Sequence, residues 1–397
     1  MESDARNNIV DADKAAGANG PKAARGAASD TDILSNAPSL MKGSSSKRVA
    51  FFDNAKGMLI LLVVIGHLLT FMPNNSSALT STATIWIYSF HMPLFLFIGG
   101  IFASKSYNER NEYRGENFLF YMALCLIFVL LSLVATVAMG GDEGFNFFNQ
   151  ANSPWYLWVM AIYVLLVPLF SRIKAGVMLP ILIAIALCSG FWLNSDNRTL
   201  FACAKLIVYC PIFAAGCYIG LPRAMRIQER LFGSNKVWIV RIAALAVLVA
   251  WFVFLYQLDP EKAIVFKRMS TAWNEFDIMA DSLGGSAWLF IALRLGFYVW
   301  SAAIGIAFML IAPKSRCFLS RWGEHSLQIY ILHIIVIRIM SHCGLFEYLL
   351  GLSHWMVLYP FVLGVLLTAL IGAPRFLQTW ADALKGLCKK AVRTEAR

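Results

Sequence analysis

Long apolar runs alternate with short polar breaks along most of the chain, from Phe51 onward. A helix that crosses a bilayer needs about 20 apolar residues, and runs near this length recur ten times. An open sheet is excluded, because lipid leaves its edge groups unpaired. The pattern therefore predicts an all-α, polytopic membrane bundle of about ten transmembrane helices. The expected spans are residues 53–72, 83–103, 118–139, 155–171, 175–193, 203–221, 237–258, 284–312, 323–341 and 355–373.

The two ends of the chain have a different composition from this middle part. Residues 1–47 are rich in Ala, Ser, Gly, Asp and Asn and contain no apolar run, which is typical of a disordered tail. The tail also lacks the apolar core of a secretory signal peptide. We expect a transmembrane domain at residues 48–375, followed by a basic tail at residues 376–397.

Composition narrows the class of protein. Hydrophobic residues make up 59% of the 397 residues and charged residues only 14%, whereas a soluble domain carries about 25% charged residues. This excludes a soluble enzyme, a disordered protein and a disulfide scaffold. The eight cysteines form no CxxC pair, so the sequence indicates no metal site.

Basic residues are distributed unevenly over the breaks between the spans. Breaks on one side hold twelve Lys and Arg residues, and breaks on the other side hold four. The positive-inside rule then places both termini in the cytoplasm, as expected for a multi-pass protein of the plasma membrane. The same rule accounts for the net charge of +11, so no nucleic-acid partner is expected.

Ionisable residues within the first span stand out from its apolar background. Lys56 and His67 lie eleven residues apart, which puts both on one helix face, about 16 Å apart along the axis. Asp53 lies one turn before Lys56 and can pair with it. A charge inside a span usually marks function. The alternatives are an interfacial anchor for Asp53 and Lys56 and an interhelical hydrogen bond for His67.

The second and ninth spans carry further histidines at similar depth. His91 precedes Pro93, which should kink its helix, and His333 ends a polar stripe that includes Tyr330. Arg294 in the eighth span lies at a comparable depth. We expect these groups to converge with His67 in the middle of the bundle, where they would serve proton transfer or anion handling.

Three other ionisable residues lie nearer the span ends. Lys205 and Arg241 are expected at the membrane interface, and His342 is expected in solvent.

Four motifs in this order resemble the acyltransferase 3 family of integral-membrane acyltransferases, which includes the fucose 4-O-acetylase-like proteins. The resemblance covers roughly residues 48–375. The motifs are Asp53-Asn54-Ala55-Lys56-Gly57 with Gly66-His67, then Ser89-Phe90-His91-Met92-Pro93-Leu94-Phe95, then Pro154-Trp155-Tyr156-Leu157, and Ser326-Leu327-Gln328-Ile329-Tyr330-Ile331-Leu332-His333.

This resemblance implies acyl transfer, usually of acetyl from acetyl-CoA, to a hydroxyl of a cell-surface carbohydrate or glycolipid. Lys56 and His67 match the basic-x10-His pattern of the family, and His91 matches its His-x-Pro motif. The family often has Ser-Gly where this chain has Gly99-Gly100. That departure removes any role for the serine.

The implied chemistry assigns roles to the same residues. His67 is the expected general base or a transient acyl carrier. Lys56 with Asp53 would bind the CoA end of the donor or orient the thioester, and the expected catalytic residues are His67, His91 and Lys56. His91, Arg294, Tyr330 and His333 would bind the acceptor or stabilise the oxyanion.

A rival interpretation is a transporter or polysaccharide exporter, because buried histidines and a kinked helix also suit proton-coupled transport. Against it, the two halves of the chain show no inverted repeat.

Overall fold

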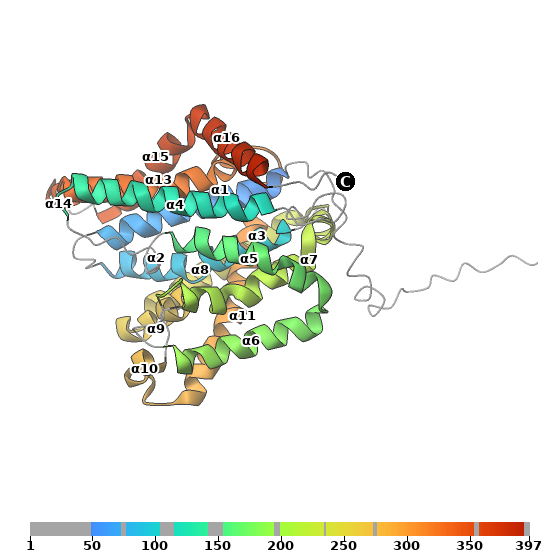
Figure 1. Ribbon diagram of the computed structural model, residues 1–397. Helices are drawn as coiled ribbons and strands as arrows, with labels where there is room; N and C mark the ends of the chain where they lie inside the picture. The colour runs from blue at the N-terminus through green and yellow to red at the C-terminus, as the bar shows by residue number, and fades with distance from the viewer. Residues whose placement is uncertain are drawn as a thin grey trace, which may run out of the picture. The chain divides into compact units, whose positions relative to one another are not determined.

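The structure is a computed structural model that describes residues 49–72, 77–103, 115–141, 154–193, 199–233, 236–272, 276–352 and 357–392. The expected disordered tail, residues 1–47, lies outside the described residues. Helices make up the regular structure of the described part (Figure 1). They are α1 (Ala50–Phe71), α2 (Ala78–Tyr88), α3 (His91–Ile101), α4 (Gly115–Ala138), α5 (Trp155–Arg172), α6 (Ala175–Trp192), α7 (Cys203–Phe232), α8 (Val237–Gln257), α9 (Pro260–Thr271), α10 (Phe276–Met279), η3 (Asp281–Leu283), α11 (Ala287–Ile311), α12 (Phe318–Glu324), α13 (Ser326–His342), α14 (Leu345–Leu352), α15 (Tyr359–Gly372) and α16 (Arg375–Ala391).

These helices match the expected spans closely. Among the described residues, eight helical segments are long and apolar enough to cross a membrane, with α2 and α3 counted as one. They correspond to the first eight expected spans. The ninth is a bent pair, because α13 and α14 meet at 67°, and the tenth is the shorter α15. The prediction of a polytopic helical membrane bundle is confirmed.

The outer helices of the bundle expose apolar side chains. On α8, Ile242, Leu245, Val249 and Val253 are exposed at spacings of three and four. This spacing makes one continuous apolar face. Such a face is stable because its surrounding solvent is lipid rather than water.

The second span is broken before His91, whereas the sequence predicted a kink at Pro93. Pro93 falls in the first turn of α3, where a missing N–H costs least. The carbonyl of Ser89, which Pro93 would otherwise bind, accepts a hydrogen bond from the Ser301 hydroxyl at 3.0 Å. A side chain of α11 therefore satisfies the backbone at the break.

Glycines allow two pairs of helices to pack closely. A Cβ on Gly57 of α1 would collide with the backbone of Leu319 in α12, and one on Gly323 would collide with the backbone of Asp53. Gly100 of α3 and Gly216 of α7 face each other in the same way. The glycine at position 100 thus has a packing role in this chain.

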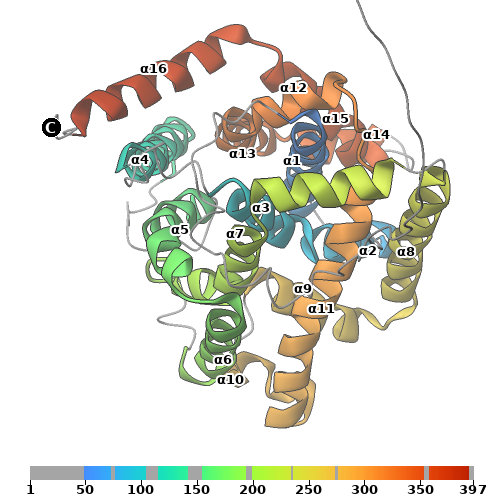
Figure 2. The ribbon, with the colours of Figure 1, turned by 90° about the vertical axis from the view of Figure 1, so that its right-hand side faces the viewer.

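Two segments run across the ends of the bundle helices (Figure 2). One is the part of α7 after Gly220, whose φ of +62° breaks the helix. The other is α16, which packs against α4 and α13. Residues 376–391 of the expected basic tail are therefore helical.

Candidate active site

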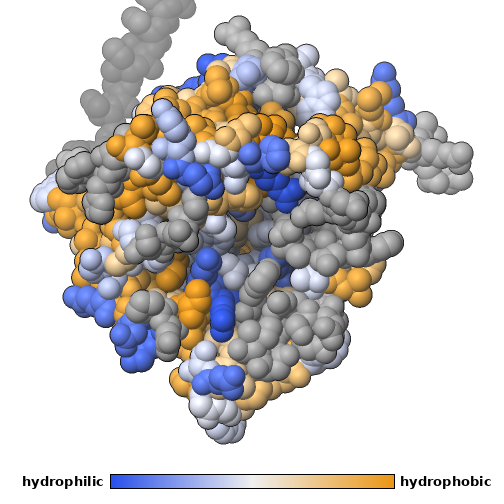
Figure 3. Space-filling model, turned by 90° about the vertical axis from the view of Figure 1, so that its left-hand side faces the viewer, coloured by the Kyte–Doolittle hydropathy of each residue, from blue (hydrophilic) through white to orange (hydrophobic). Residues whose placement is uncertain are grey.

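A large polar cavity opens among the helices of the bundle. Its volume is about 880 Å³, within the usual range for a small-molecule site. Its lining comes from α1, α2, α3, α4, α5, α7, α9 and α13. Figure 3 looks onto the end of the bundle that carries α9, α10 and α14 in Figure 1, and hydrophilic residues gather there around a hollow.

His67 of α1 and His333 of α13 face each other beside this cavity. Their ring centroids lie 5.1 Å apart, and His67 lines the cavity. His333 Nδ1 bonds to the carbonyl of Ile329 at 2.9 Å. A carbonyl only accepts, so Nδ1 carries the hydrogen and Nε2 is left as an acceptor. Nε2 is buried and has no partner within the described part of the chain.

His91 is held in a similar way at the break between α2 and α3. Its Nδ1 donates to the carbonyl of Ile87 at 2.7 Å, which again leaves Nε2 as the acceptor. Its ring packs edge-on to Tyr88 at 5.1 Å, and both side chains line the cavity. The structure thus brings together the three histidines whose similar depth the sequence indicated.

Tyr330 connects the polar cavity to a smaller space below it. Its ring lies 5.4 Å from that of Tyr156 and 6.0 Å from that of His333. Tyr330, Val63 and Met92 line both the large cavity and a small one of about 20 Å³. The small cavity is also lined by residues nearer the start of α1 and α13, namely Ile60, Ser326 and Leu327.

Lys56 and Asp53 lie at the opposite end of α1 from His67. Lys56 Nζ is 3.2 Å from Asp53 Oδ1, and the same ammonium lies 5.2 Å from the centre of the Phe102 ring. Asp53 is buried and Lys56 is half-buried. One face of α1 therefore runs from this ion pair through Ile60 and Val63 to His67.

Asn54 ties this end of α1 to neighbouring segments. Its Nδ2 donates to the carbonyls of Pro313 and Ser315 at 2.8 and 2.7 Å. Its Oδ1 accepts a hydrogen bond from the Ser320 hydroxyl. A single buried amide thus joins α1 to the segment that leads into α12, and it holds the neighbouring ion pair in place.

Arg294 does not reach the polar cavity, contrary to the sequence-based expectation. It is buried in α11, with its guanidinium 5.5 Å from the Phe290 ring. It fills the space left by Gly190 of α6, where a Cβ would collide with it. The sequence placed Arg294 at the right depth but could not show which neighbours its side of α11 would meet.

Several cations that the sequence did not assign to the site line the cavity. Lys205 was expected at the interface, but it is 8% exposed and its Nζ lies 5.2 Å from the Trp155 ring. His342 is exposed, as expected, and also lies at the wall of this cavity. Arg338 lies five residues after His333 in the same helix. A charged residue at this position inside a span was the sequence signal that could have assigned Arg338 to the site. The remaining cations are Lys267 and Arg268 of α9.

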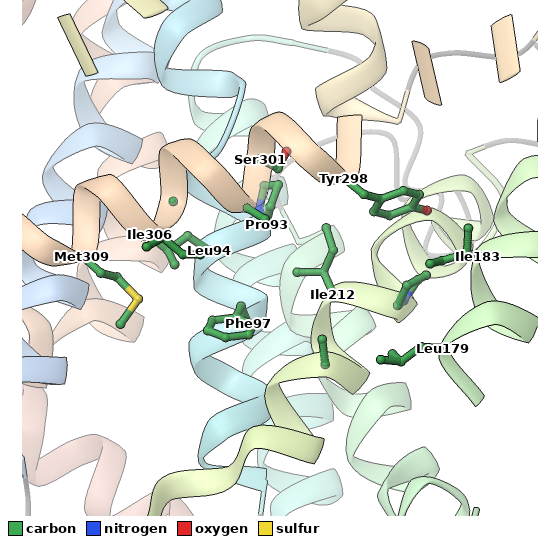
Figure 4. A pocket seen from close by; sticks show the side chains of 14 residues that line it. Pro93, Leu94, Phe97, Leu179, Ile183, Ile212, Tyr298, Ser301, Ile306 and Met309 are labelled. Carbon is green, nitrogen blue, oxygen red and sulfur yellow. The ribbon is translucent and has the colours of Figure 1, made fainter. Parts of the chain in front are cut away.

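A second cavity lies on the other side of α3. Its volume is about 230 Å³, and α3, α6, α7 and α11 supply an almost entirely apolar lining (Figure 4). Its two hydroxyl groups are already bound to backbone, because Tyr298 donates to Val208 at 2.9 Å and Ser301 donates to Ser89. The described residues that line this cavity offer no further polar side chain for chemistry.

The fold and the site together define a membrane-embedded enzyme with a histidine-lined polar cavity. Residues 49–373 match the family model described as an acyltransferase domain. The chain therefore belongs to this acyltransferase family, the acyltransferase 3 family that the sequence motifs resembled. Membership confirms that the protein is an enzyme of acyl transfer in a membrane.

Two relatives are similar over different lengths. The nodulation protein NolL of Mesorhizobium japonicum is 24% identical over 325 residues, which cover 75% of this chain and 79% of the relative. NolL of Sinorhizobium fredii is 31% identical over 149 residues, 34% of this chain and 41% of the relative. No solved structure matches the chain.

Proposed function

We propose that this enzyme transfers an acetyl group from acetyl-CoA to a hydroxyl of a cell-surface carbohydrate or glycolipid, with His67 as the general base. The observation that carries the proposal is the pair of His67 and His333, whose ring centroids lie 5.1 Å apart, with His67 at the wall of the polar cavity. A neutral imidazole at a cavity wall can take a hydroxyl proton as the oxygen attacks a thioester.

The two fixed histidines limit what each can do. His91 and His333 both donate Nδ1–H to a backbone carbonyl, so their neutral rings present Nε2 as acceptors. Acceptors bind hydroxyl hydrogens but do not stabilise an oxyanion. We therefore assign His91 and Tyr330 to acceptor binding, and His333 to sharing the proton that His67 removes.

The ion pair at the start of α1 is our proposed contact for the donor. Asp53 and Lys56 are held by the Asn54 network, and the α1 face between them and His67 lines the small cavity. An acyl group that is still bonded to CoA as a thioester, and that extends along this face, would reach His67 from the Lys56 end. We also propose that this end, and both termini, lie on the cytoplasmic side of the plasma membrane, which the distribution of basic residues over the breaks supports.

The test is acetyl-CoA turnover by the purified protein in detergent, followed as release of the CoA thiol. We expect His67→Ala to lower release at least a hundredfold, since general base catalysis contributes 10²–10⁴-fold. The matched control His342→Ala, at the cavity wall, should keep more than a tenth of the rate. Thiol release by His67→Ala at the wild-type rate would contradict the base assignment.

The exporter alternative has its own outcome in this assay. An exporter would release no CoA thiol from acetyl-CoA, with or without an acceptor. If the protein does release CoA thiol, mass spectrometry of surface glycans from cells with wild-type protein and with His67→Ala would identify the acceptor by its lost acetyl groups.

A further inference from the structure

The cationic side chains of the polar cavity exceed what the proposed transfer needs. Lys205 of α7, Lys267 and Arg268 of α9, and Arg338 of α13 all line it. No Asp or Glu belongs to its lining in the part of the chain that the structure describes. Like charges gathered at one cavity repel each other and favour an anion between them.

Aromatic faces hold two of these cations. Lys267 Nζ lies 5.4 Å from the centre of the Tyr88 ring, and Lys205 Nζ lies 5.2 Å from that of Trp155. An aromatic face attracts an ammonium and orients it. Burial lowers the pKa of Lys267 from its ordinary value.

A buried donor points to the same kind of ligand. Ser270 of α9 is 1% exposed and lines the cavity. Its hydroxyl has no partner among the described residues, whereas its own carbonyl accepts a hydrogen bond from Tyr209. A buried hydroxyl without a partner is costly. An oxyanion that enters the cavity would satisfy it.

The position of these groups separates them from the proposed donor site. Lys56 and Asp53 lie at the start of α1, whereas the cations lie around its last turns, where Thr70 and Phe71 line the same cavity. The cavity, at about 880 Å³, has room for a sugar with a charged substituent.

We infer that the acceptor is anionic: a sugar that carries a phosphate or a carboxylate group, held by Lys205, Lys267, Arg338 and Ser270 while its hydroxyl faces His67. This inference rests on the proposed function and names the substrate class of the same site.

The test measures binding by calorimetry to the full chain in phosphatidylcholine nanodiscs, without acetyl-CoA. The probes are a hexose 1-phosphate, a hexuronic acid and a neutral methyl hexoside. We expect at least one anionic probe to bind ten times more tightly than the neutral one. Whichever anionic probe binds identifies the group. Equal affinity for all three probes would overturn the inference.

Variants test whether the tighter binding of the anionic probe comes from the cations of the polar cavity. Lys267→Gln and Arg338→Gln should each weaken the anionic probe about tenfold, or about 1.4 kcal/mol. Lys262→Gln is the matched control, because Lys262 lies on the same helix but is exposed and pairs with Asp259 at 3.3 Å. An equal effect of Lys262→Gln and Lys267→Gln would contradict the assignment.

Two further outcomes keep the inference separate from the proposed function. If Lys267→Gln weakens CoA binding and leaves the anionic probe unaffected, the cations serve the donor and the inference is wrong. If the purified protein releases no CoA thiol but binds the anionic probe, the proposed function fails and the anion site stands. Should Lys267→Gln not fold, a salt titration of the wild type replaces it: binding that does not weaken with salt overturns the inference.

Discussion

The two cavities on either side of α3 show how neighbouring residues enter different environments. His91 and Met92 line the polar cavity, and Pro93 and Leu94, next in the chain, line the apolar one. In the polar cavity, lysines, arginines and histidines point inward. In the apolar cavity both hydroxyl groups are tied to backbone carbonyls. All four residues belong to α3, so the comparison teaches that the face of the helix on which a residue lies decides whether it can take part in chemistry.

The largest effect should come from placing the same charge in each cavity. Leu94→Asp buries a carboxylate without a cation in the apolar lining, and we expect a loss of about 3–5 kcal/mol in stability. Met92→Asp places it beside the cations of the polar cavity, so its loss should be much smaller. Thermal denaturation of both variants in detergent measures the difference. Equal losses would show that the cavities do not differ in electrostatics.

A smaller effect should follow from filling each cavity with the same bulky side chain. Thr136→Trp narrows the polar cavity from α4, and we expect acetyl transfer to fall about tenfold because a well-placed acceptor is excluded. Ala302→Trp fills the apolar cavity from α11 and should change transfer less than twofold. Steady-state rates with acetyl-CoA and the identified acceptor check both. A larger loss of transfer in Ala302→Trp than in Thr136→Trp would show that the acceptor binds in the apolar cavity, and the assignment to the polar cavity would be wrong.

The smallest effect concerns pH. An ordinary lysine has a pKa of about 10.4. Because the pKa of Lys267 is lowered, Lys267 loses its charge at a lower pH than an ordinary lysine does. Anion affinity should therefore fall as pH rises through this lowered pKa, while Lys205, Arg268 and Arg338 supply the remaining charge. Lys267→Arg, which stays charged, should move the fall to higher pH. Calorimetry with the anionic probe from pH 7 to pH 10 measures it, and coincident profiles would rule out Lys267 as the titrating group.

Helix positions and the depth of polar residues could be read from the sequence. The spacing of Lys56 and His67 placed both on one face of α1, and the structure has that face lining both the small and the large cavity. The depth of His91 and His333 was also readable. The same reasoning placed Arg294 with them, but depth does not fix direction, and Arg294 packs against Phe290 instead.

Apart from Arg338, the cations of the polar cavity could not be found in this way. Lys267 and Arg268 lie on α9, outside the spans, and Lys205 lies at the start of α7. Residues near a span end look interfacial, since snorkelling is the usual fate of a lysine there. Only the packing of α9 against α2 and α11 brings Lys267 over the Tyr88 ring.

The sequence by itself determined that this chain is a helical membrane protein and an acyltransferase, because apolar run length and local motifs are properties of the chain alone. The tertiary structure decided which polar groups share a cavity. Close contact of Gly57 with α12 and of Gly100 with Gly216 sets how each helix is turned about its axis. That rotation, which depends on partners distant in sequence, placed His67, His333 and the cations together and left Arg294 outside.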